Sequence, residues 1–172
     1  AEVMTASVAD FTPDSAEGAA TVTVDDTAGC PRYSGVTVRG VTVGESPEWL
    51  KNLLLATGQR PINNIVDITN FILLGLGQPL HCFDLAKVTD EHIVVRTCPA
   101  GTKLTTLDGK EHELDEADMM ICDPQKPLAI AGVFGGLESG VTESTSDVFI
   151  ESAWFNPTRV RKTARRHGLS TD

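Results

Sequence analysis

Apolar and polar residues alternate over several short stretches of the chain, a period of two that is typical of β-strands with one buried face. The longest alternation covers residues 33–43, and a shorter one covers residues 21–24. Further strands are predicted at residues 92–97, 103–107, 110–114, 119–122, 128–134 and 148–152. Asp108-Gly109 separates two of these strands and predicts a tight hairpin turn.

The first of three predicted helices begins at Ser46-Pro47-Glu48, where a hydroxyl cap and a proline in the first turn favour a helix start. Gly58 ends it. Its expected apolar face consists of Trp49, Leu50, Leu53 and Leu54.

The second helix is predicted from the cap Asn63 to about Leu76, with Gly77 as its end. Its apolar residues cover a wide arc, so we expect this helix to be largely buried. The third follows Pro157, covers residues 158–167, is strongly basic and closes at Gly168.

Strands outnumber helices, and the two do not alternate regularly along the chain. This pattern predicts an α+β fold in which two sheets pack on each other and helices lie on one side. We interpret residues 1–29 as a linker or the edge of a preceding module, and residues 30–172 as one domain. Because the sequence stops at Asp172, directly after the start of another structured turn, we expect the domain to be cut from a longer chain.

The chain carries 24 acidic and 14 basic residues, a net charge of −10, which argues against binding of nucleic acid by the whole surface. A local basic patch could still bind nucleic acid. The sequence has neither an apolar run long enough to cross a bilayer nor a signal pattern, so we expect a cytoplasmic protein without a membrane partner. The four cysteines form no CxxC pair and do not cluster with the four histidines. We therefore expect free, mostly buried thiols and no metal site.

Polar residues crowd the apolar stretch at residues 58–85, which suggests the wall of a pocket because buried polar groups need partners. His81 follows a Gly-Gln-Pro turn in this stretch. It is either a half-buried histidine bonded to a carbonyl, or a general base or orienting group beside a reacting ester. Glu151 is either a surface residue at a strand end or a pocket acceptor for a hydroxyl or amine.

Two further features have alternative interpretations. Gly135-Gly136 indicates either a bulge or turn, or a place where a ligand approaches the backbone. The basic helix is either a solvated face paired with the acidic surface, or a contact for phosphate or for a protein. The chain has no Gly-Ser elbow, phosphate loop, dinucleotide fingerprint or metalloprotease helix, so an ATP-dependent activity within it is unsupported.

Three ordered blocks resemble the editing module in the beta subunit of bacterial phenylalanyl-tRNA synthetase. The blocks run from Arg60-Pro61-Ile62-Asn63-Asn64 to His81-Cys82-Phe83-Asp84, over Ala131-Gly132-Val133-Phe134-Gly135-Gly136, and from Ala164 to Asp172. The resemblance covers about residue 30 to the end. It implies three layers, two sheets and helices, and an activity that hydrolyses tyrosine misattached to phenylalanine tRNA.

The resemblance also implies roles for individual residues. Glu151 matches the acceptor for the tyrosine hydroxyl, and Gly135 matches a pocket glycine. His81, Thr69 and Asn70 match catalytic positions near the ester and the terminal adenosine. Arg60 and Thr171 match further substrate-binding positions, and Arg165 and Arg166 of the basic helix are the expected nucleic-acid contacts.

No serine or cysteine nucleophile with a base is evident, so the expected chemistry is attack by a positioned water. No cofactor is expected in this segment, since ATP and Mg would serve only the full synthetase. The expected partners are the 3′ end of phenylalanine tRNA and the alpha subunit of a heterotetramer. The alternative is a non-catalytic module that binds tRNA or docks on a subunit.

Overall fold

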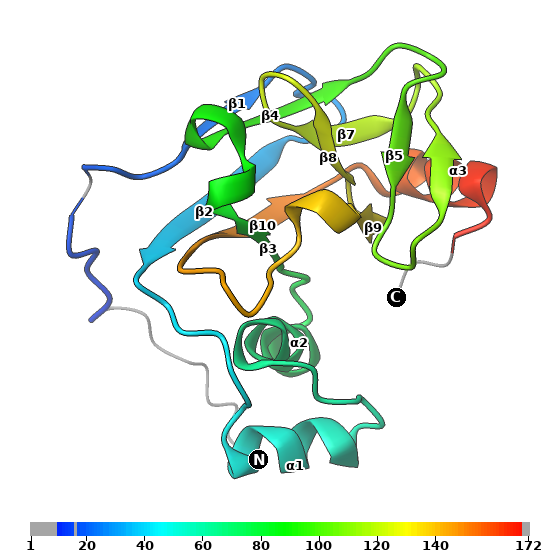
Figure 1. Cartoon of the computed structure of the whole chain (residues 1–172). Coiled ribbons are helices and arrows are strands. Elements are labelled where there is room, and N and C mark those ends of the chain that lie inside the picture. The colour runs from blue at the N-terminus through cyan, green and yellow to red at the C-terminus, as the bar shows by residue number, and fades with distance from the viewer. Residues whose placement is uncertain (1–9, 16, 170–172) are drawn as a thin grey trace.

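Two β-sheets packed face to face form the centre of the structure, a computed structural model that describes residues 10–15 and 17–169 (Figure 1). The larger sheet has the order β1-β4-β7-β8-β9 and the smaller one the order β2-β10-β3. The strands of the larger sheet are β1 (Thr21–Val24), β4 (His92–Thr97), β7 (Met119–Cys122), β8 (Pro127–Ile130) and β9 (Phe134–Gly135). Those of the smaller sheet are β2 (Arg32–Arg39), β3 (His81–Asp84) and β10 (Asp147–Trp154).

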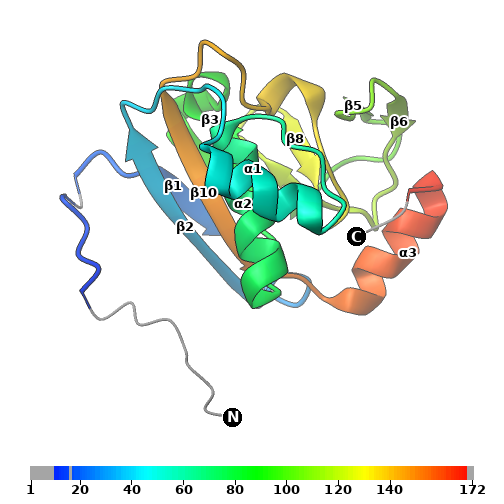
Figure 2. The ribbon, with the colours of Figure 1, turned by 90° about the horizontal axis from the view of Figure 1, so that it is seen from below.

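The remaining elements surround this pair of sheets. They are the hairpin β5 (Lys103–Thr105) and β6 (Glu111–Glu113), the helices α1 (Glu48–Ala56), α2 (Asn64–Leu76) and α3 (Pro157–His167), and the 3₁₀ turns η1 (Leu85–Lys87), η2 (Thr89–Glu91) and η3 (Leu137–Ser139). Helices α1 and α2 lie on the side of the small sheet that faces away from the large sheet. Figure 1 shows these layers one above the other, and in Figure 2, seen from below, the two helices lie in front of the strands. Helix α3 packs elsewhere, beside β7. The predicted α+β fold is confirmed.

The core lies between the two sheets. Phe83 and Phe149 extend from the small sheet and meet Ile93, Val95 and Ile121 of the large one, and none of these side chains is more than 2% exposed. Full burial of one such side chain contributes about 1.5–3 kcal/mol. The alternation seen in the sequence therefore reflects one face of each strand directed into this layer.

The small sheet is held by a long central strand. β10 pairs antiparallel with β2 along its whole length and with β3 over four residues. In this register Glu151 has Gly35 on one side and His81 on the other. Residues far apart in the sequence are thereby brought to one point of the sheet.

Several predicted boundaries are confirmed and others need correction. The Asn63 side chain accepts a hydrogen bond from Val66 N and caps α2, while Gly77 (φ 73°) ends that helix. The predicted hairpin around Asp108-Gly109 is present, although its strands are shorter than predicted. The strand predicted at 128–134 is instead two strands, β8 and β9, because the chain turns at Gly132 (φ 67°). Strand β2 stops at Arg39, before Gly40 (φ 69°), short of the predicted residue 43.

The predicted hydroxyl cap of α1 is wrong. Pro47 occupies the cap position, with no side-chain hydrogen bond to the helix. The Ser46 hydroxyl donates instead to the fully buried carboxylate of Asp67 in α2, at 2.5 Å. Asp67 also accepts from Ile62 N at 2.8 Å, so this satisfied buried carboxylate ties the segment before α1 to α2.

The expectation that α2 is largely buried is also wrong for the described part of the chain. Its buried residues are Asp67 and Thr69, whereas Ile68, Phe71 and Leu76 are 37–67% exposed. On α1, likewise, Leu50 and Leu54 are buried but Trp49 and Leu53 are about half exposed. The reason is that α1 and α2 form the outermost layer, so each can bury only the stripe that faces inward.

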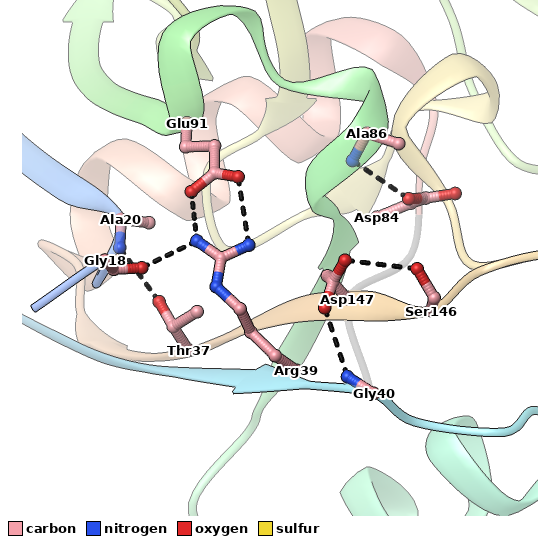
Figure 3. A network of polar contacts seen from close by, with 10 residues as sticks. All are labelled: Gly18, Ala20, Thr37, Arg39, Gly40, Asp84, Ala86, Glu91, Ser146 and Asp147. Carbon is pink, nitrogen blue, oxygen red and sulfur yellow. Dashed lines mark hydrogen bonds and ion pairs between the residues drawn. The ribbon is translucent and has the colours of Figure 1, made fainter. Parts of the chain in front are cut away.

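Strand β1 belongs to the folded unit even though it precedes residue 30. It pairs in parallel with β4 in the large sheet. Arg39 at the end of β2 forms an ion pair with Glu91 of η2 and donates to the carbonyl oxygen of Gly18, which links the small sheet to the segments before β1 and β4 (Figure 3). Both partners of the ion pair are more than 40% exposed, so solvent screens it and it adds little to the stability. The folded unit thus extends at least to residue 21.

Candidate functional site

His81 and Glu151 lie side by side in the small sheet, as register partners on β3 and β10. Partners in an antiparallel pair point to the same face. For this pair the face is the inner one, since the His81 ring packs edge-on against the core residue Phe83 with ring centroids 4.6 Å apart. The core-facing register therefore places a carboxyl and an imidazole together at the layer between the sheets.

Glu151 is buried, with 6% of its surface exposed. The Tyr33 hydroxyl on β2 donates to its Oε2 at 2.6 Å. Burial raises the pKa of Glu151 to about 7, and the hydrogen bond from Tyr33 acts in the opposite direction. The surface alternative for Glu151 is therefore excluded, and the side chain is an acceptor that already binds one phenol.

His81 is half-buried, with its ring turned toward the core. Burial lowers the pKa of its imidazole to about 4, so the ring is neutral at physiological pH. Its Nε2 is buried and has no hydrogen-bond partner among the described residues. The half-buried position agrees with the first interpretation of this histidine, but Nε2 does not have the hydrogen bond that would satisfy it. An unpartnered buried nitrogen is costly, which marks this atom as one that a ligand or water can satisfy.

Gly135 on β9, in the large sheet, lies against the His81 ring from the opposite side. A Cβ added at Gly135 would lie 2.7 Å from His81 Cε1 and 2.9 Å from Leu107 Cδ1. Its φ is not positive, so close approach, rather than backbone conformation, is the reason for glycine here. The structure therefore brings Gly135, His81 and Glu151 together from three strands and both sheets.

The nearby thiols are poor nucleophiles. Burial raises the pKa of Cys82 to about 12 and that of Cys30 to about 11, and the charge of Glu151 adds to both effects. A thiolate, not a thiol, attacks esters. All four cysteines are free and buried, which confirms the prediction made from their spacing.

The other expected pocket residues are not joined to this group by any hydrogen bond within the described chain. Thr69 is buried in α2, and its hydroxyl donates to Val66 O of the same helix at 2.7 Å. Asn70 follows it and is half-buried, while Arg60 is exposed in the loop before α2. Thr171 lies outside the described residues. Helix α2 contacts β3, so Thr69 and Asn70 belong to the layer directly beside the strand that carries His81.

The basic residues of helix α3 fall into two groups: some pair with acidic residues of the domain, and others remain exposed. Arg159 pairs with Asp26, and Arg166 pairs with the fully buried Asp118. His167 also bonds to Asp118, at 2.7 Å. By contrast, Arg165 is exposed and forms no ion pair with any described residue. One face of α3 thus anchors the helix, and another leaves positive charge in solvent.

Sequence reasoning missed Tyr33 and Asp118. Tyr33 is the one tyrosine of the chain and lies in a predicted strand, but its contact with Glu151 spans 118 residues and depends on the β2-β10 register. Asp118 lies in a turn before β7 and gave no motif. The sequence signal that was available, one of three acidic residues in the turn before an apolar strand, is too common to single it out.

Across 10–15 and 17–169, no three His, Cys, Asp or Glu side chains are grouped so as to hold a metal ion. Within the same residues, no helix is long and apolar enough to cross a membrane.

Comparisons with known proteins agree with the resemblance. The family model described as the B3/4 domain matches residues 29–172. The phenylalanine–tRNA ligase beta subunit of Bacteroides fragilis is 62% identical over 151 residues, which cover 88% of this chain and 18% of that protein. The one from Aquifex aeolicus is 53% identical over 143 residues, covering 83% and 18%. The chain thus spans about a fifth of the length of these relatives.

A solved structure supports the fold. An N-terminal fragment of the phenylalanyl-tRNA synthetase beta-subunit from Pyrococcus horikoshii superposes with a TM-score of 0.56 at 16% identity, covering 86% of this chain and 49% of that one. The expected similarity to this beta subunit is confirmed. Because the family model matches most of its length, the chain belongs to the B3/4 domain family.

Proposed function

We propose that this chain is the editing module of a phenylalanine–tRNA ligase beta subunit and hydrolyses tyrosine misattached to phenylalanine tRNA. The observation that carries the proposal is the buried carboxyl of Glu151, which accepts a hydrogen bond from a phenol and lies beside a histidine with an unpartnered nitrogen. The names of the relatives support the assignment to a ligase subunit.

The discrimination rests on one hydroxyl. A pocket shaped for an apolar ring rejects an added hydroxyl only weakly, whereas a site built to bond that hydroxyl strongly disfavours the analogue without it. A hydrogen bond to a charged group contributes about 1.5–3 kcal/mol, a preference of roughly 10- to 100-fold for the tyrosyl ester. In this proposal Glu151 reads the side chain, and Gly135 leaves room for it.

The ester is attacked by water. The low pKa of His81, about 4, makes it a weak base, so we assign it to orienting the water or the ribose of the terminal adenosine. Thr69 and Asn70 assist at the ester and adenosine, and Arg60 and Thr171 complete the substrate-binding wall. The raised thiol pKa values of Cys30 and Cys82 support a mechanism without a covalent intermediate.

The remaining assignments follow from the same proposal. Arg165 and Arg166 contact the phosphates near the 3′ end of the tRNA, with Arg165 the freer of the two. The alpha subunit is the partner in the ligase, ATP and Mg serve the synthetic reaction in the rest of that enzyme, and the protein acts in the cytoplasm.

The test is deacylation of pre-formed tyrosyl-tRNA by the ligase that contains this chain. Glu151→Ala should slow it roughly 10- to 100-fold through the lost acceptor, and His81→Ala by about 100-fold through loss of positioning. Phenylalanine activation should stay unchanged in both variants. Glu138→Ala and His92→Ala are the matched controls, since Glu138 is 78% exposed and His92 bonds to Thr23 in the other sheet.

Normal deacylation by both site variants would refute the site assignment. Absence of deacylation in the unaltered enzyme, together with retained tRNA binding, would favour the non-catalytic binding module instead.

A further inference from the structure

Tyr33 makes the one side-chain hydrogen bond that Glu151 receives within the described residues. The bond is short, 2.6 Å, and joins β2 to β10 at the centre of the small sheet. A carboxylate has two oxygens and can accept several hydrogen bonds. Tyr33 occupies Oε2, so Oε1 is the oxygen available to a second donor.

The Tyr33 ring is not free to swing away. It stacks on Phe149 with centroids 6.4 Å apart and planes within 7°, and it meets Phe155 edge-on at 6.4 Å. The backbone of Tyr33 is paired with Ala153 in the sheet register. Because aromatic pairs and strand pairing both restrain it, the phenol is a built-in partner of Glu151 rather than a competitor that the substrate displaces.

We propose that Tyr33 is a positioning residue for side-chain specificity: it holds Oε2 of Glu151 and so presents Oε1 as the acceptor for the substrate's phenol. This inference rests on the proposed function and deepens it. It assigns the recognition of tyrosine to a pair of residues, one that touches the substrate and one that orients the first.

The surrounding charges explain why such a donor is needed. The titratable groups near Glu151 are Tyr33 on β2, His81 on β3, and the thiols of Cys30 and Cys82, whose pKa values the charge of Glu151 raises. None of them brings a positive charge at neutral pH, because burial keeps His81 neutral. A donated hydrogen bond favours the ionised carboxyl, which is the stronger acceptor, against the burial that favours the protonated form.

The experiment replaces Tyr33 by phenylalanine in the intact ligase, which keeps the ring and removes only the hydroxyl. We expect kcat/KM for tyrosyl-tRNA deacylation to fall about 10-fold at pH 7. The acid limb of the pH profile, near pH 7 in the unaltered enzyme, should move upward by about one unit because the ionised carboxyl has lost its donor. Phe155→Leu is the control, since it loosens the packing of the same ring without removing a donor, and its acid limb should not move.

A double-mutant cycle separates positioning from general damage. If Tyr33 acts through Glu151, Tyr33→Phe should cause no further loss in a Glu151→Gln background. Additive losses, or an unmoved acid limb in Tyr33→Phe, would overturn the proposal, as would a rise in kcat/KM, which would make the phenol a competitor. If the unaltered enzyme does not deacylate tyrosyl-tRNA at all, it is the proposed function that fails.

Discussion

Gly135→Ala perturbs the candidate site by a single methyl group. The added Cβ would lie 2.7 Å from Cε1 of His81, about 1 Å short of a relaxed carbon–carbon contact. The imidazole cannot retreat easily, because Phe83 holds it edge-on at 4.6 Å. Leu107, the other side chain in the way, is 48% exposed and can move its end into solvent. The overlap with Leu107 is therefore easily relieved, whereas the overlap with His81 must force the ring out of its packed position against Phe83.

The structure allows the magnitude to be worked out in two parts. Overpacking of this kind costs about 1–3 kcal/mol of folding stability, which for a domain of this size lowers the melting temperature by roughly 3–10 °C. A misplacement of about 1 Å in a positioning group reduces the rate by about 100-fold. We expect both effects. The lower stability leaves only a few per cent of the protein unfolded at the assay temperature, so unfolding cannot account for the much larger loss of tyrosyl-tRNA deacylation.

The matched control is Gly140→Ala, whose Cβ would press on the same Leu107 at 3.2 Å but has no contact with His81. Deacylation of tyrosyl-tRNA and thermal unfolding are measured for both variants in parallel. Gly140→Ala should retain activity within about twofold, since its neighbour is a mobile side-chain end. Full activity in a folded Gly135→Ala variant, or equal losses in the two variants, would refute the argument that Gly135 makes room for His81.

Two further predictions concern stability and pH. Burial alone would raise the pKa of Asp118, but hydrogen bonds from Asp115 N, His167 and Thr163 hold it below its usual 3.8; its contribution is therefore present above about pH 4 and lost below. Asp118→Asn should cost about 2–4 kcal/mol in urea unfolding at pH 7, with the gap to the unaltered protein narrowing below pH 4, and a gap independent of pH would contradict the prediction. For Glu151 the folded-state pKa is raised to about 7 from 4.5, so its protonated form stabilises the fold below about pH 4.5 and this stability is lost as the pH rises through 7. The unaltered protein should lose about 1–3 kcal/mol between pH 5 and pH 8 relative to Glu151→Gln, and identical pH slopes for the two would rule this out.

The extent of successful prediction differs between local and long-range features. The Asn63 cap, the Gly77 and Gly168 helix ends and the Asp108-Gly109 hairpin were predictable, because each depends on residues within one turn. Ser46 was misassigned for the complementary reason: its hydroxyl has a distant buried carboxylate to bond, and that bond outweighs a local cap.

The same division applies to the candidate site. The blocks around His81, Gly135 and Glu151 were recognisable by resemblance, but their meeting point was not visible in any local pattern. It depends on β3 and β2 pairing with β10 in one register, and on β9 of the other sheet lying against His81. The partner of Glu151, Tyr33, was missed because 118 residues separate the two.

By itself, the sequence determined the three helices with their glycine ends, most of the strands and the α+β class, since the apolar period and the turn residues act over a few positions. It did not reveal β3, the strand that carries His81, and several strand ends needed correction. Only the tertiary structure decided which polar groups are buried and what they bond: Glu151 with Tyr33, Asp67 with Ser46, and Asp118 with the end of α3. The physical reason is that burial of a charge is set by neighbours brought in from other layers. The sequence alone does not distinguish a strand carboxyl that faces solvent from one that, like Glu151, is buried between two packed sheets.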